Sequence, residues 1–390
     1  MIVVDVLLLV LLVLGLAAGI GRGLSGSLGL FAGLVLGGAA AFWLVPLVND
    51  ALPTQQWRPA LVLASAAALV IGGAVLGSAV GSAVRRGVDR VRPLRALDRV
   101  LGGVVGVAVA ALALSLAGSS LAVTGTPVIS TALSSSSVLR TIERFTPPPV
   151  ASAIAELRSF VFDEGLPALG DLLDSPAVDI PPADLEDPEL ARAAASVARV
   201  SGTAYACGRS STGTGFVISP DRVVTNAHVV AGVERPLVEL PGLGAREGRI
   251  VYFDPVDDLA VIAVDGLAAE PLPLADRLGA GAPAVVQGYP LGGPFTMVPA
   301  GVLSTGRAPI PDIYDESSSL REIYDLRAAV RPGNSGGPLL TEDGAVAGVV
   351  FARAENDPER GYAMTVDELA PVSAEAPLLT DAVPSGRCIG

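Results

Sequence analysis

The sequence predicts an all-α transmembrane domain of four helices followed by an all-β domain. The chain is unusually apolar, with 51% hydrophobic residues and a mean hydropathy of +0.57, and only 17% of its residues are charged, against roughly 25% in soluble proteins. Its 390 residues exceed the roughly 100–200 of one domain. From about Val200, short β-rich runs alternate with Gly, Pro and Asp, which is typical of strands and turns. We divide the chain into a transmembrane domain (1–124), a linker (125–195) and a β domain (196–390).

Four apolar runs fill most of the first domain. Each is close to the ~20 residues that cross ~30 Å of hydrocarbon as a helix. They carry no polar stripe, which argues against buried helices of a soluble domain. A cleaved signal peptide is disfavoured for the first run, because it lacks a basic start and three more runs follow. The runs are Ile2–Ile20, Ser27–Val48, Ala60–Val84 and Val100–Val123.

The charges between these runs predict their orientation. Basic loops stay in the cytoplasm, and six arginines separate the third run from the fourth. Four spans then put both termini, and residues 125–390, outside the cytoplasm. A nucleic-acid patch is the rival interpretation, but the loop is short and tightly bracketed by spans. The six arginines are Arg85, Arg86, Arg90, Arg92, Arg95 and Arg99.

Glycines recur at every fourth position within the runs. This spacing lets helix backbones approach closely in lipid, so we expect a compact bundle. An ion pathway usually needs polar groups inside the membrane, and Asp5 is one of the few ionisable groups there, so the spans do not support transport. The glycines are Gly15/Gly19, Gly29/Gly33/Gly37, Gly73/Gly77/Gly81 and Gly102/Gly106.

Residues 125–195 are rich in Ser, Thr, Pro and acids, which predicts a spacer that proteases could cut. We expect short helices at Ala151–Phe162 and Leu190–Arg199. The whole chain carries −13. Its first 124 residues hold eight arginines and four aspartates, so residues 125–390 carry −17. This charge argues against DNA or RNA as a partner, since phosphate binding needs clustered cations.

The β domain contains the only histidine, His228, directly after an apolar β run. A lone histidine is more often structural than catalytic. Further along the chain, Arg331–Pro338 places Ser335 among glycines that allow a tight turn and leave backbone N–H groups exposed. Two such groups beside a serine hydroxyl form an oxyanion hole. An ordinary glycine-rich turn is the alternative.

Chain order selects the fold of the β domain. The segment Gly333–Gly337 also fits G-x-S-x-G, the nucleophile elbow of α/β-hydrolases, in which the histidine follows the serine. Here the histidine precedes Ser335 by 107 residues. The order His, Asp, Ser is that of chymotrypsin-type proteins, so we expect a chymotrypsin-like double β-barrel.

Three aspartates could complete this set. Asp258 directly precedes the strand Leu259–Val264 and is favoured, because a strand would hold its carboxylate rigidly. Asp257 would face the opposite way from Asp258. Asp254 precedes Pro255 and suits a turn.

These motifs resemble known families. Thr214–Ile218, Thr225–Val230, Asp258–Val261 and Gly333–Pro338 resemble trypsin-like proteases of the bacterial HtrA type. The four apolar runs look like a CvpA (colicin V production) membrane domain. The pairing is similar to the MarP family, the membrane-anchored serine proteases of mycobacteria and related actinobacteria. Unlike in HtrA proteases, no PDZ domain is expected after the protease domain.

The resemblance implies roles for these residues. Ser335 would be the nucleophile, His228 the general base and Asp258 the group that orients the imidazole. The N–H groups of Gly333 and Ser335 would form the oxyanion hole. No cofactor is expected, and no metal, because one His and two distant Cys cannot build a zinc site.

The substrate pocket is predicted to be apolar. Trypsin carries an acid six positions before its nucleophile, where this chain has Ala329. The other wall is expected at Val350, Phe351 and Ala352. A basic P1 side chain is therefore not expected, and a small or medium apolar one is.

Cys207 and Cys388 are the only cysteines. Both lie in the part predicted to be exported, where oxidising conditions allow disulfides, so we expect them to pair. Two unrelated free thiols are the alternative.

Taken together, the residues and the resemblance predict a multi-pass cell-membrane serine endopeptidase with its protease domain on the periplasmic side. Its partners would be the lipid bilayer and protein substrates in the cell envelope. The resemblance implies a role in envelope stress, notably acid tolerance. One alternative is a transport or channel protein with a sensing β domain, and another is a catalytically inactive binding module.

Overall fold

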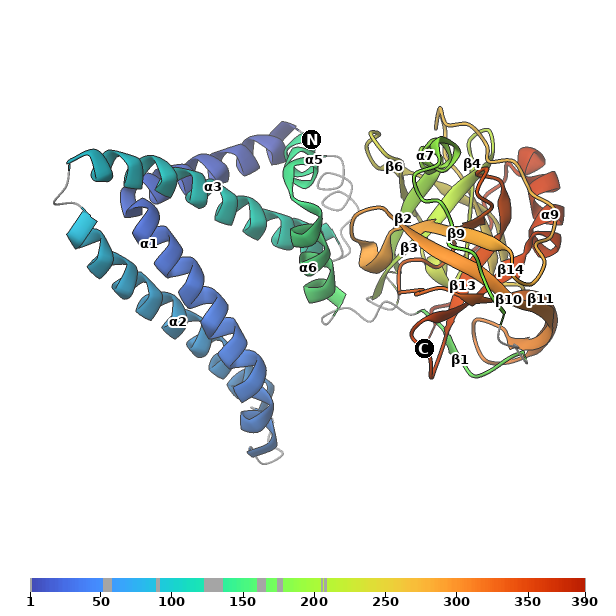
Figure 1. Cartoon of the computed structure of the whole chain (residues 1–390), viewed down its shortest axis with the longest axis horizontal. Coiled ribbons are helices and arrows are strands. Elements are labelled where there is room, and N and C mark those ends of the chain that lie inside the picture. The colour runs from blue at the N-terminus through green and yellow to red at the C-terminus, as the bar shows by residue number, and fades with distance from the viewer. Residues whose placement is uncertain are drawn as a thin grey trace. The chain divides into compact units, whose positions relative to one another are not determined.

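The computed structural model describes residues 2–51, 58–88, 92–122, 136–159, 166–173, 178–204, 206 and 209–389. They form two compact units (Figure 1). The helical unit runs to Ala117 and includes Ser137–Ile142, and the β unit holds the rest of the described chain.

Three long apolar helices build the helical unit: α1 (Ile2–Ala51), α2 (Arg58–Val88) and α3 (Arg92–Ala122). Each contains a segment long and apolar enough to cross a membrane. The third and fourth apolar runs correspond to α2 and α3, whereas the first two runs are continuous in α1. Four separate spans are therefore not shown.

The helix α1 is broken in the middle at Gly23, whose φ of 71° and ψ of 173° are not helical. A straight helix of its 50 residues would be about 75 Å long at ~1.5 Å per residue, more than twice the ~30 Å hydrocarbon core. Only glycine adopts such backbone angles readily. The break divides α1 into an N-terminal arm and a C-terminal arm.

Each arm packs through glycine on a different helix. A Cβ atom placed on Gly19 would lie 2.2 Å from the carbonyl oxygen of Gly102 in α3, and one on Gly33 would lie 2.2 Å from that of Gly73 in α2. No side chain fits at these crossings. The backbones therefore approach as closely as the four-residue spacing predicts.

A polar cluster holds the break in α1. The buried carboxylate of Asp98 in α3 accepts hydrogen bonds from the backbone N–H and the hydroxyl of Ser25, at 3.1 and 2.9 Å. Arg85 in α2 lies 4.0 Å from this carboxylate and also donates to the carbonyl of Gly21. The two backbone segments that flank Gly23 thus bond to side chains of the other two helices.

Two short helices follow in the chain, α5 (Ser137–Phe145) and α6 (Pro148–Ser159). Asp5 accepts a 2.7 Å hydrogen bond from the hydroxyl of Ser137. The carboxylate singled out near the start of the first apolar run therefore holds the N-terminus of α5. The predicted helix Ala151–Phe162 corresponds to α6, and its last residues lie outside the described ranges.

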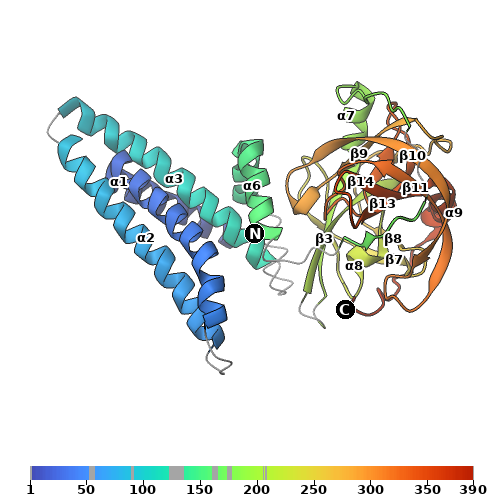
Figure 2. The ribbon, with the colours of Figure 1, turned by 60° about the horizontal axis from the view of Figure 1, so that its bottom comes forward.

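The β unit contains two seven-stranded sheets. The N-terminal sheet has the order β6-β5-β2-β3-β4-β8-β7, and the C-terminal sheet β1-β13-β12-β9-β10-β11-β14, with an additional β13–β14 pairing that closes it. Figure 2 shows the two sheets with helices α7, α8 and α9. The bounds of these elements are as follows: β1 (Ala168–Leu169), α7 (Pro188–Ala194), β2 (Val197–Ala204), β3 (Arg209–Ser219), β4 (Arg222–Thr225), α8 (Ala227–Val230), β5 (Leu237–Glu239), β6 (Arg246–Glu247), β7 (Arg249–Asp254), β8 (Leu259–Ala263), β9 (Pro283–Gly288), η2 (Pro290–Gly292), β10 (Thr296–Pro311), β11 (Ser318–Arg327), β12 (Pro338–Leu340), β13 (Val346–Ala354), β14 (Arg360–Thr365), α9 (Val366–Glu375) and η3 (Ala376–Leu378).

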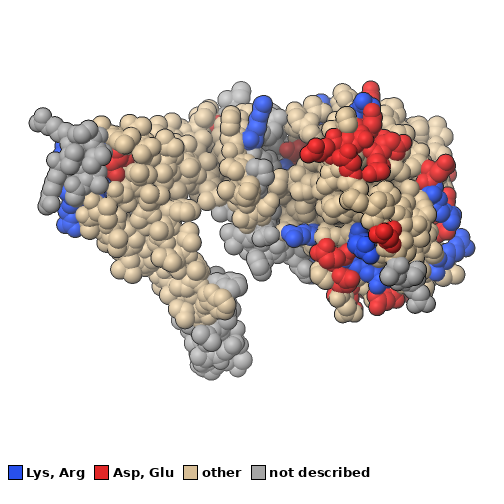
Figure 3. All heavy atoms as spheres, in the orientation of Figure 1, with Lys and Arg blue, Asp and Glu red and all other residues tan. Residues whose placement is uncertain are grey.

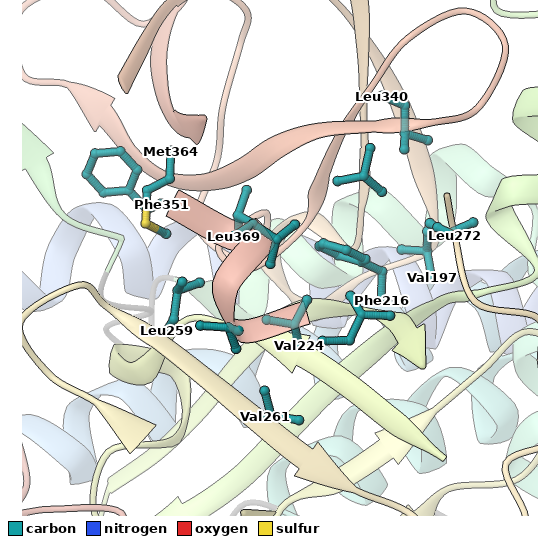
Figure 4. Close-up of a cluster of buried hydrophobic side chains, with 14 of the residues drawn as sticks. Val197, Phe216, Val224, Leu259, Val261, Leu272, Leu340, Phe351, Met364 and Leu369 are labelled. Carbon is teal, nitrogen blue, oxygen red and sulfur yellow. The ribbon is translucent and has the colours of Figure 1, made fainter. Parts of the chain in front are cut away.

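Apolar side chains from both sheets meet in one cluster. Phe216, Leu259, Phe351 and Met364 belong to it, together with Leu369 from α9 (Figure 4). The remaining apolar residues fill the interior of each sheet. The cluster thus joins the N-terminal sheet, next to which His228 lies, to the C-terminal sheet, whose strands β11 and β12 flank Ser335 in the sequence.

Described parts of the predicted linker pack on the β unit. Leu166 is buried among C-terminal sheet residues, and β1 pairs in parallel with β13. Ile180 covers Gly301 of β10 so closely that a Cβ there would lie 2.2 Å from its Cγ2 atom. The described residues 166–173 and 178–195 therefore belong structurally to the β unit, although their composition resembles a spacer.

Charge is distributed as the sequence suggests. On the face drawn in Figure 3, acidic and basic atoms gather on the β unit, and the described surface of the long helices is almost free of them. Many large side chains of α1 and α2 are exposed apolar groups, such as Leu36, Ile71 and Leu76. Such a surface is stable in lipid rather than in water.

Candidate active site

His228 lies on the short helix α8, which begins directly after β4. The preceding Asn226 is fully buried, and its side-chain amide donates a 2.8 Å hydrogen bond to the carbonyl of Asp258. The end of β4 is thereby tied to the segment that joins β7 to β8.

Asp258 is the aspartate that contacts the imidazole. One of its carboxylate oxygens lies 2.8 Å from His228 Nδ1, and the other accepts the His228 backbone N–H at 2.9 Å. Both side chains are buried. Two bonds from one residue fix the carboxylate in position, so it can hold the ring in a single orientation.

The other two aspartates have different surroundings. Asp254 Oδ1 accepts the N–H groups of Val256 and Asp257, at 2.8 and 3.1 Å, so it organises the turn, as its place before Pro255 suggested. Burial raises the pKa of the Asp257 carboxyl, and nearby Asp254 and Glu368 raise it further, while Arg321 lowers it. Neither carboxylate bonds to His228.

Ser335 lies in a tight loop, Arg331–Gly337, which we call the Ser335 loop. Gly333 and Gly336 have positive φ angles of 90° and 78°, which favour glycine. A Cβ on Gly333 would lie 2.4 Å from the carbonyl oxygen of Tyr289. The glycines are thus required by backbone angle and by space.

Thr214 of β3 anchors this loop to the N-terminal sheet. Its hydroxyl donates to Gly333 O at 2.6 Å and accepts from the Tyr289 N–H at 3.0 Å. Its backbone N–H donates to Ser335 O at 2.8 Å. In the sequence analysis Thr214 was only part of a motif. The one signal for its anchoring role was its position between two glycines, Gly213 and Gly215.

Gly213 lies between the two halves of the site. A Cβ there would lie 3.0 Å from Ser335 O and 2.6 Å from Val229 Cγ2. Ser335 and the helix of His228 therefore flank the same backbone position. Among the described residues, His228 Nε2 is buried and has no hydrogen-bond partner, so this nitrogen can accept a proton from a group that enters beside it.

The backbone N–H groups of Gly333 and Ser335 donate to no acceptor among the described residues. Their neighbours are occupied, since Asn334 N–H donates to Arg331 O at 3.0 Å and Gly336 N–H to Val350 O at 2.8 Å. Two unoccupied donors in one rigid loop are what an oxyanion hole requires.

The predicted pocket residues lie at two levels of burial. Ala329 is partly exposed, whereas Val350, Phe351 and Ala352 are buried. The ring of Phe351 packs in the cluster between the sheets, under the guanidinium of Arg321. Val330, which sequence reasoning passed over, fills the space beside Gly361, where a Cβ would lie 2.4 Å from its Cγ2 atom.

The strand β1 covers the edge of β13 just beyond these residues. The register of β12 on β13 ends at Pro338 and Val349, and the Ser335 loop then bonds to Val350. Next along the same strand, the Arg353 N–H donates to Pro167 O at 3.0 Å and the Glu355 N–H to Leu169 O at 2.8 Å. Linker residues thus accept hydrogen bonds from backbone N–H groups of β13 that would otherwise lie on an open edge of the sheet.

Cys388 packs against the interior of the N-terminal sheet, and Cys207, its predicted partner, lies outside the described residues. Their pairing stays a prediction. In the described part of the chain, no three His, Cys, Asp or Glu side chains gather in a way that could hold a metal ion.

Comparison with known proteins adds two family matches. Residues 213–349 match the trypsin-like peptidase domain, and residues 4–147 match the Colicin V production protein. The serine protease Rv3671c of Mycobacterium tuberculosis strain H37Rv is 36% identical over 392 residues, which cover 99% of this chain and 98% of that protein.

Matches to further proteins cover the β unit. The bovine mitochondrial serine protease HTRA2 is 38% identical over 146 residues, 36% of this chain and 31% of that protein. The crystal structure of the Rv3671c protease in its active form superposes with a TM-score of 0.53 at 39% identity, covering 57% of this chain and all of that one.

Proposed function

Because the chain belongs to the MarP family of membrane serine proteases, to which Rv3671c of M. tuberculosis belongs, we propose that His228, Asp258 and Ser335 are its catalytic triad. The observation that carries this proposal is the pair of bonds from Asp258 to His228, at 2.8 and 2.9 Å, in a β unit whose Ser335 loop holds two unoccupied N–H groups.

The roles follow from this geometry. Asp258 binds Nδ1, so the neutral ring carries its proton there and leaves Nε2 as the base. His228 then takes the proton of Ser335 as its hydroxyl oxygen attacks the scissile carbonyl. The N–H groups of Gly333 and Ser335 stabilise the oxyanion, and His228 returns the proton to the leaving amine.

We propose that the substrate enters along β13. A peptide whose P1 side chain reaches the partly exposed Ala329 would run beside the backbone of Val350–Ala352, as extended peptides do at open sheet edges. The N–H of Arg353 lies on that edge and is occupied by β1. Substrate and β1 therefore compete for the same backbone groups. The apolar surroundings favour a small or medium apolar P1 residue.

The break at Gly23 supports a four-span topology. Each arm of α1 is long enough for one crossing, and a reversal of direction there would give the predicted four spans. The arginine-rich segment before α3 would then remain cytoplasmic, with the β unit on the periplasmic side. A reporter active only in the cytoplasm should be active when fused near Pro93 and silent when fused after Val200. The opposite pattern would put the protease inside the cell.

The proposed substrates are proteins of the cell envelope, cleaved during stress such as acid exposure. The family carries this part of the proposal, together with the predicted exported position of the β unit. A bridge between Cys207 and Cys388 would suit that compartment. Comparing the envelope proteins released by the wild-type and Ser335→Ala enzymes by mass spectrometry would identify the substrates.

Labelling with a fluorophosphonate probe tests the triad directly. The wild-type chain should be labelled, and Ser335→Ala and His228→Ala should not be, with peptidase activity lost by several orders of magnitude. Asp258→Asn should be severe, and Asp257→Asn is the matched mild control. An unlabelled wild-type chain would favour the alternative of a transport protein with a sensing β unit.

A further inference from the structure

Arg321 is the largest side chain buried almost completely in the β unit, with only 2% of its surface exposed. It lies on β11 of the C-terminal sheet, in phase with the buried Ile323 and Asp325. A buried guanidinium is costly unless its charge and its donors are matched. Its partners therefore indicate what it is there to hold.

The guanidinium reaches across to the Asp254–Asp258 turn of the N-terminal sheet. One terminal nitrogen donates to the carbonyl of Asp257 at 3.1 Å, and the other donates to the carbonyl of Pro311 at 2.9 Å. Its planar group lies 5.4 Å from the ring centroid of Phe351, a cation–π distance. The fork thus joins β11 to the turn that carries Asp258.

The bond to Asp257 acts on a strained position. Asp258 has a φ of 55°, in the left-handed region that residues other than glycine adopt less readily. The carbonyl of Asp257 belongs to the peptide plane that precedes Asp258, and φ is measured from that plane. Holding this carbonyl therefore fixes the direction in which the Asp258 side chain leaves the backbone.

The charges around Arg321 point to the same place. Burial lowers the pKa of its guanidinium, and four carboxylates oppose that effect: Asp258 most strongly, then Asp257, Glu368 and Asp254. Arg321 in turn lowers the pKa of Asp257, which burial, Asp254 and Glu368 raise. The guanidinium thus offsets negative charge at the turn that carries Asp258.

From these contacts we infer that Arg321 is a positioning residue for the reaction: it holds the Asp257–Asp258 peptide so that the Asp258 carboxylate meets both the ring and the backbone of His228. The inference rests on the proposed triad. It does not make Arg321 a catalytic residue, because the side chain touches neither the imidazole nor Ser335. The hydrogen bond also links the two sheets, since Arg321 belongs to β11 of the C-terminal sheet and Asp257 to the β7–β8 connection of the N-terminal sheet.

The experiment uses the full-length protein in detergent, with Arg321→Met, Arg321→Lys and the control Arg360→Met. Arg360 is also a largely buried arginine of the C-terminal sheet, and it pairs with the buried Asp325. Because it also pairs with Asp171, directly beyond β1, this control is compared by kcat and by the histidine signal, not by KM. Steady-state cleavage of an apolar peptide gives kcat and KM. A small misplacement of a catalytic group can cost about 100-fold in rate, so Arg321→Met should lower kcat by about that factor with KM within ~2-fold.

The lone histidine supplies a second readout. With only one His in the chain, selective isotope labelling gives a single imidazole, and its Nδ1–H proton bonded to Asp258 should resonate far downfield. This signal should disappear in Arg321→Met and persist in Arg360→Met. Arg321→Lys keeps the charge without the fork, so it should restore part of kcat and of the signal.

The outcomes separate the two hypotheses. A folded Arg321→Met with wild-type kcat and an unchanged downfield proton overturns the inference. If that variant does not fold, Arg321→Lys decides: wild-type kcat overturns the inference, and a reduced kcat with a weakened signal supports it. If the wild-type protein shows no peptidase activity but Arg321→Met still loses the downfield signal, the positioning role stands and the proposed function is wrong.

Discussion

The pairing of β1 with β13 can be tested by Leu166→Ala, which should show whether β1 competes with the substrate. Leu166 is 9% exposed and belongs to the buried cluster that also contains Val330 and Val350. It directly precedes the segment that bonds to Arg353 and Glu355. Truncating it weakens the attachment of β1 without changing any group of the proposed triad. If β1 and the substrate exclude each other, a weaker β1 should leave the edge open more often.

The expected size follows from burial. Leu→Ala in a core costs about 2–5 kcal/mol, and at the rim of the C-terminal sheet we take the lower figure, about 2 kcal/mol. An apparent dissociation constant scales inversely with the fraction of open molecules, and ~1.4 kcal/mol corresponds to tenfold. KM should therefore fall by up to about 25-fold, and kcat should stay unchanged because the chemistry is untouched.

Steady-state kinetics on a short apolar peptide, with thermal unfolding of the same samples, measures both effects. The matched control is Ile180→Ala, another linker residue on the C-terminal sheet, which contacts Gly301 away from β13. It should lower the melting temperature and leave KM alone. A Leu166→Ala enzyme that is destabilised but has an unchanged or higher KM would refute the competition.

Three further predictions concern other parts of the chain. Gly33→Leu should separate α1 from α2, because its Cβ would meet the Gly73 carbonyl at 2.2 Å, whereas Gly38→Leu, with nothing within 4 Å, should not; thermal aggregation in detergent compares them. The Ser317 hydroxyl and then backbone N–H groups lower the pKa of Asp312 to about 2. The loss of stability in Asp312→Ala should therefore be largest above about pH 4, the usual Asp range, and should shrink as the pH falls towards 2. Thermal unfolding across that range checks it, and a difference that does not vary with pH contradicts it. Cys388→Ser should lower the melting temperature as much as reductant does in the wild type; two free thiols in the unreduced protein would exclude the bridge.

Local chemistry explains which site residues could be predicted. The Ser335 loop could be predicted because its positive φ angles require glycines, Gly333 and Gly336. His228 could be predicted because it is the only histidine of the chain. Asp258 could be ranked above its neighbours because it abuts the strand β8. In the structure its carboxylate lies 2.8 Å from the imidazole Nδ1, and its catalytic role stays a proposal.

Long-range contacts explain what could not be predicted. Arg321 lies 64 positions from Asp257, and the one local signal was an arginine in phase with buried residues of a strand. The linker was interpreted as a spacer because its composition is polar, yet a few apolar side chains such as Leu166 and Ile180 suffice to attach it. The continuity of α1 depends on Gly23, and glycine is compatible with a helix, a turn or a break.

Helix α1 also has a consequence for the order of assembly during synthesis. Its C-terminal arm meets α2, the next helix to be made, so Gly33 and Gly73 can pair early and over a short stretch of chain. Its N-terminal arm must wait for α3, because Gly19 packs on Gly102 and Gly106. The 87 residues from Gly19 to Gly106 take about 4–17 s to translate at ~5–20 residues per second. During that interval the glycine face of the first arm has not yet met its partner helix, and it is available to a second nascent chain or to an insertion chaperone until Gly102 and Gly106 pack on it.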